Sequence, residues 1–172
     1  MLAEWNLRYE EWIIGDGEPD RHIDEVFDWF TLGFWSKEKL GKITEEQKGA
    51  VPVSDFRYRV VAEVIYLSKN ACIIDFGLRA TATAEFMPRG CQKGDYVTGE
   101  IGLLLPLVTE VEPREEFKKL AYRWRVRRIS ADLTPYVNSR RDESRIQYQD
   151  VLATYSVKAK CYVLHCSKVS PE

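Results

Sequence analysis

The chain has 172 residues, of which 45% are hydrophobic and 30% are charged, and its net charge at pH 7 is -2. This composition excludes a disordered chain and is typical of one globular domain with a core of its own. No stretch approaches the roughly 20 apolar residues that cross a bilayer, and the first residues lack the basic start and apolar run of a secretory signal. We therefore expect a cytoplasmic protein without a membrane segment.

Charge is distributed unevenly along the chain. Residues 1–50 carry six basic and 12 acidic residues, whereas residues 111–172 carry 13 basic and eight acidic residues. Such asymmetry is typical of a surface for nucleic acid or an acidic partner at the basic end, or of two ends that pack together and cancel. We favour the second interpretation.

The first 50 residues predict an acidic, tryptophan-rich β extension. Apolar and polar residues alternate over residues 4–14, which is typical of a half-buried strand. Residues 23–35 fit helical spacing at several positions, but their aromatic density favours a strand. Residues 36–50 have the polar composition of a linker. Because about 35 residues are too few for an independent core, we expect residues 1–50 to pack on a body formed by residues 51–172.

The body of the chain predicts three strands, one helix and two further strands. The strand segments share β-branched and aromatic residues bounded by turn residues, and they are residues 57–67, 71–76, 96–105, 129–137 and 146–166. The helix is predicted between the third and fourth strands. It begins at Pro113, which suits a first helical position, and its apolar residues follow helical spacing as far as Trp124.

The order of these elements, together with the segment Gly94-Asp95-Tyr96-Val97, resembles the OB-fold, whose S1-type members carry a Gly-Asp-x-Val motif. The resemblance covers about two-thirds of the chain. It implies a mainly β fold with an OB-like five-stranded barrel and one helix between strands 3 and 4, plus the N-terminal β-rich extension. It also implies a binding module for oligonucleotides, oligosaccharides or protein partners, and the fold alone does not choose among them.

The hairpin that would form the binding platform departs from the nucleic-acid-binding members of that family. Its positive side chains are Arg57, Arg59, Lys69 and Arg79, and Asp55, Glu63 and Asp75 lie among them. A groove for a nucleic-acid strand needs net positive charge and stacking rings. This hairpin is near neutral, which weakens the nucleic-acid interpretation.

The strongest cluster of basic residues lies at the C-terminal end of the predicted helix. Its candidate binding residues are Tyr122, Arg123, Arg125, Arg127 and Arg128. Arginines bind phosphates and aromatic rings stack on bases, so the cluster suits nucleic acid. In the alternative interpretation Trp124 packs inward and the arginines are solvated or paired with the acidic N-terminal segment, and we favour this alternative. Arg140, Arg141 and Arg145 extend the cluster if their loop folds beside it.

Tryptophans of the acidic segment form a second candidate surface. Four of the five tryptophans lie within the first 35 residues. Large aromatic residues are typical of a core, or of an interface in which they would here meet a basic protein partner. We favour the core, and the candidate binding residues are Trp12, Trp29 and Trp35.

Residues typical of catalysis or metal binding occur without a recognised motif. Four carboxylates and a histidine gather in one segment, and they are Asp16, Asp20, His22, Asp24 and Asp28. Their spacing matches no ligand motif. His165 is a lone histidine near the end of the chain, which is typical of a structural role. The four cysteines form no CxxC pair and are expected to be reduced. We assign no metal, cofactor or catalytic residue.

We interpret the chain as a non-enzymatic binding module that acts on a macromolecular partner. A protein partner is favoured because the acidic N-terminal segment argues against general affinity for nucleic acid. An inhibitor, immunity-type or adaptor role fits such a surface. The alternative is a single-stranded nucleic-acid-binding OB-fold module that uses the Arg123–Arg128 patch. The sequence assigns neither the partner's identity nor an oligomeric state.

Overall fold

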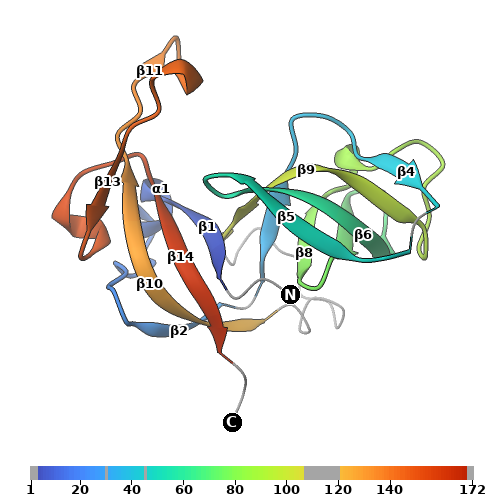
Figure 1. Ribbon diagram of the computed structural model, residues 1–172, viewed down its shortest axis with the longest axis horizontal. Coiled ribbons are helices and arrows are strands. Elements are labelled where there is room, and N and C mark those ends of the chain that lie inside the picture. Colours follow the sequence, from blue (N-terminus) through green and yellow to red (C-terminus); the bar gives the residue numbers. More distant parts are fainter. Residues whose placement is uncertain (1–3, 30, 45, 107–120, 170–172) are drawn as a thin grey trace.

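The computed structural model describes residues 4–29, 31–44, 46–106 and 121–169. These residues form two β-rich lobes that lie side by side, a barrel and a more open sheet (Figure 1). The prediction of a mainly β fold is therefore confirmed. Among the described residues, no helix has the length and apolar character needed to cross a membrane.

One lobe contains seven of the described strands, and five of these close into a barrel. The strands of this lobe are β3 (Gly33–Trp35), β4 (Gly41–Ile43), β5 (Gly49–Ser54), β6 (Arg57–Leu67), β7 (Ala71–Asp75), β8 (Arg79–Thr83) and β9 (Tyr96–Leu104). β6, β7 and β8 form an antiparallel meander, and β3 pairs with β8 in parallel. The barrel closes because β9 pairs with both β3 and β6. This closed, mixed, five-stranded barrel is compatible with the expected OB-like barrel.

The sheet lobe is assembled from both ends of the chain. Its strands are β1 (Trp5–Glu10), β2 (Val26–Trp29), β10 (Tyr122–Asp132), β13 (Tyr148–Val151) and β14 (Cys161–Val169). β14 pairs antiparallel with β1 and with β10, while β2 and β13 pair with opposite halves of β10. β1 meets the barrel where Arg8 pairs in parallel with Leu104 of β9. One hydrophobic core runs through both lobes.

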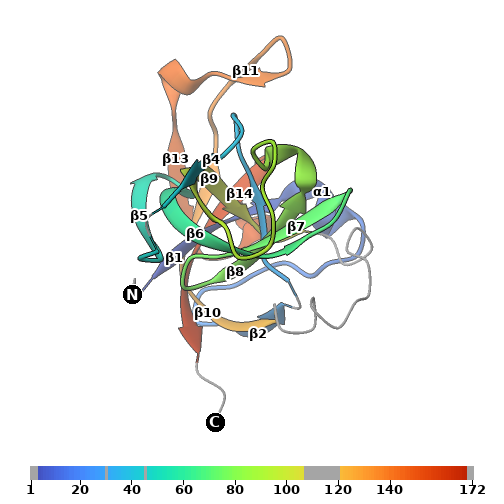
Figure 2. The same ribbon diagram turned by 90° about the vertical axis from the view of Figure 1, so that its right-hand side faces the viewer.

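A short hairpin projects from the sheet lobe in both views (Figures 1 and 2). It consists of β11 (Tyr136–Val137) and β12 (Arg140–Arg141). The two residues at its tip, Asn138 and Ser139, have φ values of 50° and 64°, as a tight two-residue hairpin turn requires. The short helices are α1 (Glu11–Gly15), η1 (Ala84–Phe86), η3 (Glu143–Arg145) and η4 (Thr154–Ser156).

The predicted helix between strands 3 and 4 is not confirmed. Its first part, residues 113–120, lies outside the described residues. For the second part of this helix the prediction is wrong, because residues 122–132 form strand β10. There Trp124 and Val126 are buried while Arg123 and Arg125 are exposed, the two-residue alternation of a strand. The α-helix among the described residues, α1, follows β1 instead.

The barrel uses different parts of the chain from those predicted. It takes β3 from the first 50 residues, before the expected boundary at residue 51. The segments predicted as its fourth and fifth strands, 129–137 and 146–166, contribute to β10, β13 and β14 of the sheet lobe. Of these strands, β14 pairs with β1, more than a hundred residues away, and a local pattern carries no information about such pairing.

Candidate functional site

Cross-strand register places polar side chains in three rows on one face of the sheet lobe. The rows cross β1, β14, β10 and β13, and they are Asn6, His165 and Arg128; Arg8, Val163, Ser130 and Asp150; and Glu10, Cys161, Asp132 and Tyr148. Residues directly opposite each other on paired strands point to the same face. Their sequence neighbours, such as Leu7 and Ile129, point to the other face and are buried in the core.

A β-bulge in β10 brings two of these side chains onto the polar face. Val126 and Arg128 pair with consecutive residues of β14, so Arg127 is an extra residue in β10. Val126 points into the core. An uninterrupted alternation would send Arg128 and Ser130 into the core as well, because the side-chain period of a strand is two. The bulge therefore creates the polar site.

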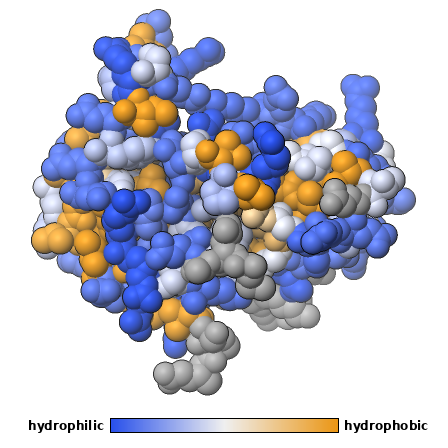
Figure 3. Space-filling view, in the orientation of Figure 1, coloured by the Kyte–Doolittle hydropathy of each residue, from blue (hydrophilic) through white to orange (hydrophobic). Residues whose placement is uncertain are grey.

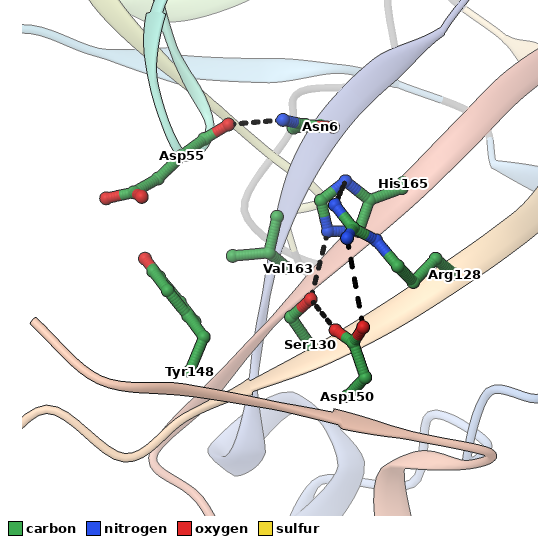
Figure 4. A pocket seen from close by; sticks show the side chains of 8 residues that line it. All are labelled: Asn6, Asp55, Arg128, Ser130, Tyr148, Asp150, Val163 and His165. Carbon is green, nitrogen blue, oxygen red and sulfur yellow. Dashed lines mark hydrogen bonds and ion pairs between the residues drawn. The ribbon is translucent and has the colours of Figure 1, made fainter.

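The polar face and the barrel enclose a pocket of about 290 Å³, which we call the polar pocket (Figure 4). Its lining residues are Asn6, Asp55, Arg128, Ser130, Tyr148, Asp150, Val163 and His165. Asp55 comes from the barrel lobe, where it lies in the turn between β5 and β6 with a φ of 44°. The Asn6 side chain donates a hydrogen bond to the Asp55 carbonyl. The pocket thus lies where the two lobes meet, a common position for ligand sites.

A directed chain of hydrogen bonds crosses this pocket (Figure 4). Arg128 Nη2 lies 3.3 Å from His165 Nδ1. Arginine only donates, so Nδ1 accepts and the neutral imidazole carries its proton on Nε2. Nε2 then donates to Ser130 Oγ over 3.1 Å, and Ser130 donates its own proton to Asp150 Oδ1 over 2.8 Å. This direction does not make His165 a base for Ser130, as nucleophilic catalysis would require.

The protonation state of His165 fits this chain. Burial, and then the positive charge of Arg128, lower the pKa of His165. The imidazole is therefore neutral near pH 7, the state in which Nδ1 accepts a hydrogen bond. Protonation would place an N–H group against the Arg128 guanidinium. We therefore expect these hydrogen bonds to form at neutral and alkaline pH.

Arg141, on the projecting hairpin, contacts two residues that line the polar pocket, Tyr148 and Asp55. Its Nε donates to Asp132 Oδ2 over 2.7 Å and its Nη2 to the Tyr148 hydroxyl over 2.7 Å. The same Nη2 lies 3.5 Å from Asp55 Oδ2. Burial, and then the negative charges of Asp132 and Asp55, raise the pKa of Tyr148 far above its ordinary value. The Tyr148 hydroxyl therefore stays protonated.

On the other side of Arg141 lies a larger concavity of about 570 Å³, which we call the arginine cleft. Its lining residues are Arg8, Trp35, Lys37, Phe56, Arg57, Arg140, Arg141 and Glu143. Five of them are positive and one is negative. Trp35 packs tightly against Gly102, where a Cβ atom would overlap the indole ring.

The positive side chains of the cleft are not equally free. Arg141 is 12% exposed and is held by several partners. Lys37 pairs with Glu143 at 2.7 Å, but these side chains are 54% and 48% exposed. Arg57 lies 3.4 Å from a β9 carboxylate, and the exposed Arg140 side chain has no partner among the described residues. Arg57 is 17% exposed and also donates to Ser54 over 3.0 Å, so it is held in place. Exposed ion pairs contribute about 0–1 kcal/mol, so Lys37 and Arg140 can exchange partners.

The predicted arginine patch lies on β10, on the polar face of the sheet. All four arginines are exposed. Arg123 donates two hydrogen bonds to Asp28, over 2.8 and 3.0 Å, and Arg127 donates to Ser167 over 3.0 Å. Arg125 has no side-chain partner in the described part of the chain. Within this patch Arg123 is therefore paired with the acidic N-terminal segment, while Arg125 provides positive charge without a side-chain partner in the described part of the chain.

The aromatic residues of that patch are less accessible. Trp124 is completely buried. The half-buried Tyr122 accepts a hydrogen bond from the Arg79 backbone over 2.7 Å, and Lys168 Nζ lies 4.9 Å from the centre of its ring. Neither ring offers an open face for stacking on a base.

The three candidate tryptophans lie apart and have different surroundings. Trp12 on α1 is 48% exposed, whereas Trp29 is buried. Trp29 donates from Nε1 to the Pro106 carbonyl over 3.2 Å. Trp35 lines the arginine cleft. These residues do not form one surface.

The acidic residues near the N-terminus do not converge either. Asp20 accepts a hydrogen bond from Thr154 over 2.6 Å, Asp28 pairs with Arg123, and the His22 ring packs edge-on against Tyr155. No group of three or more potential metal ligands occurs among the residues described. The four cysteines are free thiols.

Sequence reasoning missed the residues of the polar pocket. His165 was interpreted as a lone structural histidine, and Ser130 and Asp150 were not singled out. The alternation of charged and apolar residues around Trp124 was the available signal, since it indicates a strand with one polar face. Comparison with protein-family models, curated proteins and solved structures gives no significant match.

Proposed function

We propose that this protein is a non-enzymatic binding module whose arginine cleft takes an acidic segment of a protein partner. The observation that carries the proposal is the exchangeable positive charge of Lys37 and Arg140 in one concavity of about 570 Å³. Carboxylates are natural ligands for arginine, which binds them through two parallel hydrogen bonds. A carboxylate from a partner would replace Glu143 at little cost, because that pair is exposed.

The aromatic rings of the cleft favour a protein over a nucleic-acid strand. A strand binder needs ring faces on which bases stack. Of the two rings that line the cleft, Phe56 is 3% exposed and Trp35 is partly buried. In the polar pocket His165 donates a hydrogen bond to Ser130 and does not accept its proton, which supports binding over hydrolysis by a histidine-activated serine nucleophile. An inhibitor, immunity-type or adaptor role would use the same cleft.

Single-stranded nucleic acid is a second candidate, favoured by one observation. Arg123, Arg125, Arg127 and Arg128 are all exposed, and the Arg125 side chain has no partner in the described part of the chain. Such a row would contact successive phosphates without base stacking. In this candidate the polar face of β10, and not the arginine cleft, is the binding surface.

Fluorescence anisotropy with two labelled probes separates the candidates. The probes are a short peptide rich in glutamate and aspartate, and an oligothymidylate of equal net charge, each titrated from about 50 to 300 mM salt. We expect the peptide to bind more tightly at every salt concentration. Tighter binding of the oligothymidylate would replace the first candidate with the second, and binding of neither probe at low salt would contradict both.

A further inference from the structure

The polar pocket has open hydrogen-bond acceptors. Both nitrogens of His165 and the proton of Ser130 are already used within the chain that crosses it. Asp55 Oδ2 lies 3.5 Å from Arg141 Nη2 but accepts no hydrogen bond of normal geometry from the described residues. Asp150 Oδ2 lies 3.8 Å from Arg128, beyond hydrogen-bond distance. A buried carboxylate oxygen without a donor is costly, so a ligand that donates would be stabilised here.

The charged side chains in and next to the polar pocket carry a net charge of -1. The carboxylates are Asp55, Asp132 and Asp150, and the guanidiniums are Arg128 and Arg141. His165 is neutral and Tyr148 stays protonated, for the reasons given above. Arg141 lies closer to Asp132, at 2.7 Å, than to Asp55, at 3.5 Å. One guanidinium thus serves two carboxylates, and the uncompensated charge lies at Asp55.

The two sides of the pocket differ. Asp55 and Tyr148 lie on one side, while Ser130, Asp150, Arg128 and His165 lie on the other, with the apolar Val163 between them (Figure 4). A cation is therefore favoured on the Asp55 side, away from Arg128. The volume of about 290 Å³ suits one side chain or a small molecule.

From these observations we propose that the polar pocket binds a primary ammonium group on an alkyl stem. The ammonium donates to the Asp55 carboxylate, which is 14% exposed, and the stem packs against Val163. An ammonium carries three donors on one compact centre, which suits a single buried carboxylate better than a planar guanidinium does. The group comes either from a free alkyl amine or from a lysine side chain of a partner. This proposal concerns a different concavity from the arginine cleft and does not rest on the function proposed for it.

Amide chemical shifts of the whole protein test the proposal. The probes are n-pentylammonium chloride, cadaverine and Nα-acetyl-lysine methylamide, with n-pentanol as the neutral analogue and sodium chloride at matched ionic strength. We expect saturable shifts centred on Asn6, Asp55, Tyr148 and Val163 with the amines alone. Tighter binding of the lysine derivative than of cadaverine would identify a lysine side chain as the source, and the reverse order would identify a free amine. Equal shifts with n-pentanol, or none at these residues, would overturn the proposal.

Matched variants locate the charge that the ammonium recognises. Asp55→Asn removes the charge but keeps a residue that tolerates the left-handed backbone at this position. We expect it to weaken amine binding at least about tenfold, the effect of losing one charge-assisted hydrogen bond. Asp28→Asn removes a carboxylate from the same sheet face outside the pocket and should leave binding unchanged. Equal weakening by both variants would contradict the proposal. If Asp55→Asn does not fold, Tyr148→Phe serves in its place, with a smaller weakening expected.

Discussion

Arg141 Nε lies 2.7 Å from Asp132 Oδ2, and this ion pair fastens the projecting hairpin to the sheet lobe. The Asp132 side chain is 1% exposed and that of Arg141 is 12% exposed. Asp132 also accepts a hydrogen bond from the Thr134 backbone over 3.0 Å. The same guanidinium lines the arginine cleft and contacts Tyr148 and Asp55 of the polar pocket, so this pair connects the stability of the fold to the shape of both concavities.

Replacing Arg141 should destabilise the protein strongly. Arg141→Gln leaves the Asp132 carboxylate buried without its positive partner, and such a loss typically costs about 3–5 kcal/mol. The double variant Asp132→Asn with Arg141→Gln should recover part of this loss. Urea unfolding measures the free energy of unfolding of the single and the double variant. A single variant within about 0.5 kcal/mol of the original protein would show that the pair is not a structural contact.

Arg21 should tolerate lysine poorly. Its guanidinium is buried 4.3 Å from the centre of the Phe27 ring and 5.5 Å from that of Trp29, and it pairs with Glu25 at 2.6 Å. A planar guanidinium stacks on aromatic faces, whereas an ammonium does not, so we expect Arg21→Lys to cost about 1–2 kcal/mol. Arg59→Lys, at an exposed site on β6, is the control in the same urea titration. Equal midpoints for the two variants would refute the aromatic contribution.

His165 should make the free energy of unfolding depend on pH. Its pKa is lowered in the folded protein, so below its ordinary pKa, about 6.5, the unfolded chain binds the proton more readily. Stability should therefore fall as the pH decreases from about 7.5 to 5.5. In His165→Gln the fall should be smaller, because an amide that can still donate to Ser130 does not titrate. His22→Gln, at an exposed histidine, should keep the original pH dependence, and the reverse pattern would contradict the assignment.

Gly102 should be required for the position of Trp35. A Cβ atom there would overlap the indole ring, and overpacking of this kind costs about 1–3 kcal/mol. Gly102→Ala should therefore lower the unfolding midpoint and shift Trp35 fluorescence. Gly49→Ala is the matched control, because a Cβ at Gly49 meets no atom within 4 Å. Identical midpoints for both variants would show that the indole moves without cost.

Local patterns predicted part of this fold. Strands at 57–67 and 71–75 were located closely, because alternation and turn residues are local signals. Burial of Trp124 was also anticipated. The closure of the barrel by β3 was not, since its partners lie far along the chain.

The site was harder to predict than the strands. Asn6, Arg128 and His165 meet in one row only through the register of three strands and a bulge at Arg127. A pattern within one strand does not specify register against another strand. The arginine cleft likewise depends on where the hairpin places Arg140 and Arg141. The sequence predicted that Arg140, Arg141 and Arg145 extend the β10 patch if their loop folds beside it, whereas Arg140 and Arg141 line the arginine cleft, which contains none of the β10 arginines.

The most direct test of the proposed function compares acidic-peptide affinity among three charge-matched variants. Lys37→Gln and Arg140→Gln each remove an exchangeable charge from the arginine cleft, while Arg125→Gln removes an exposed charge from β10 outside it. We predict that each cleft variant weakens peptide binding about tenfold, as loss of a charged contact does, and that Arg125→Gln changes it less than about twofold. Equal weakening by all three variants, or a loss confined to Arg125→Gln, would contradict the assignment of the cleft.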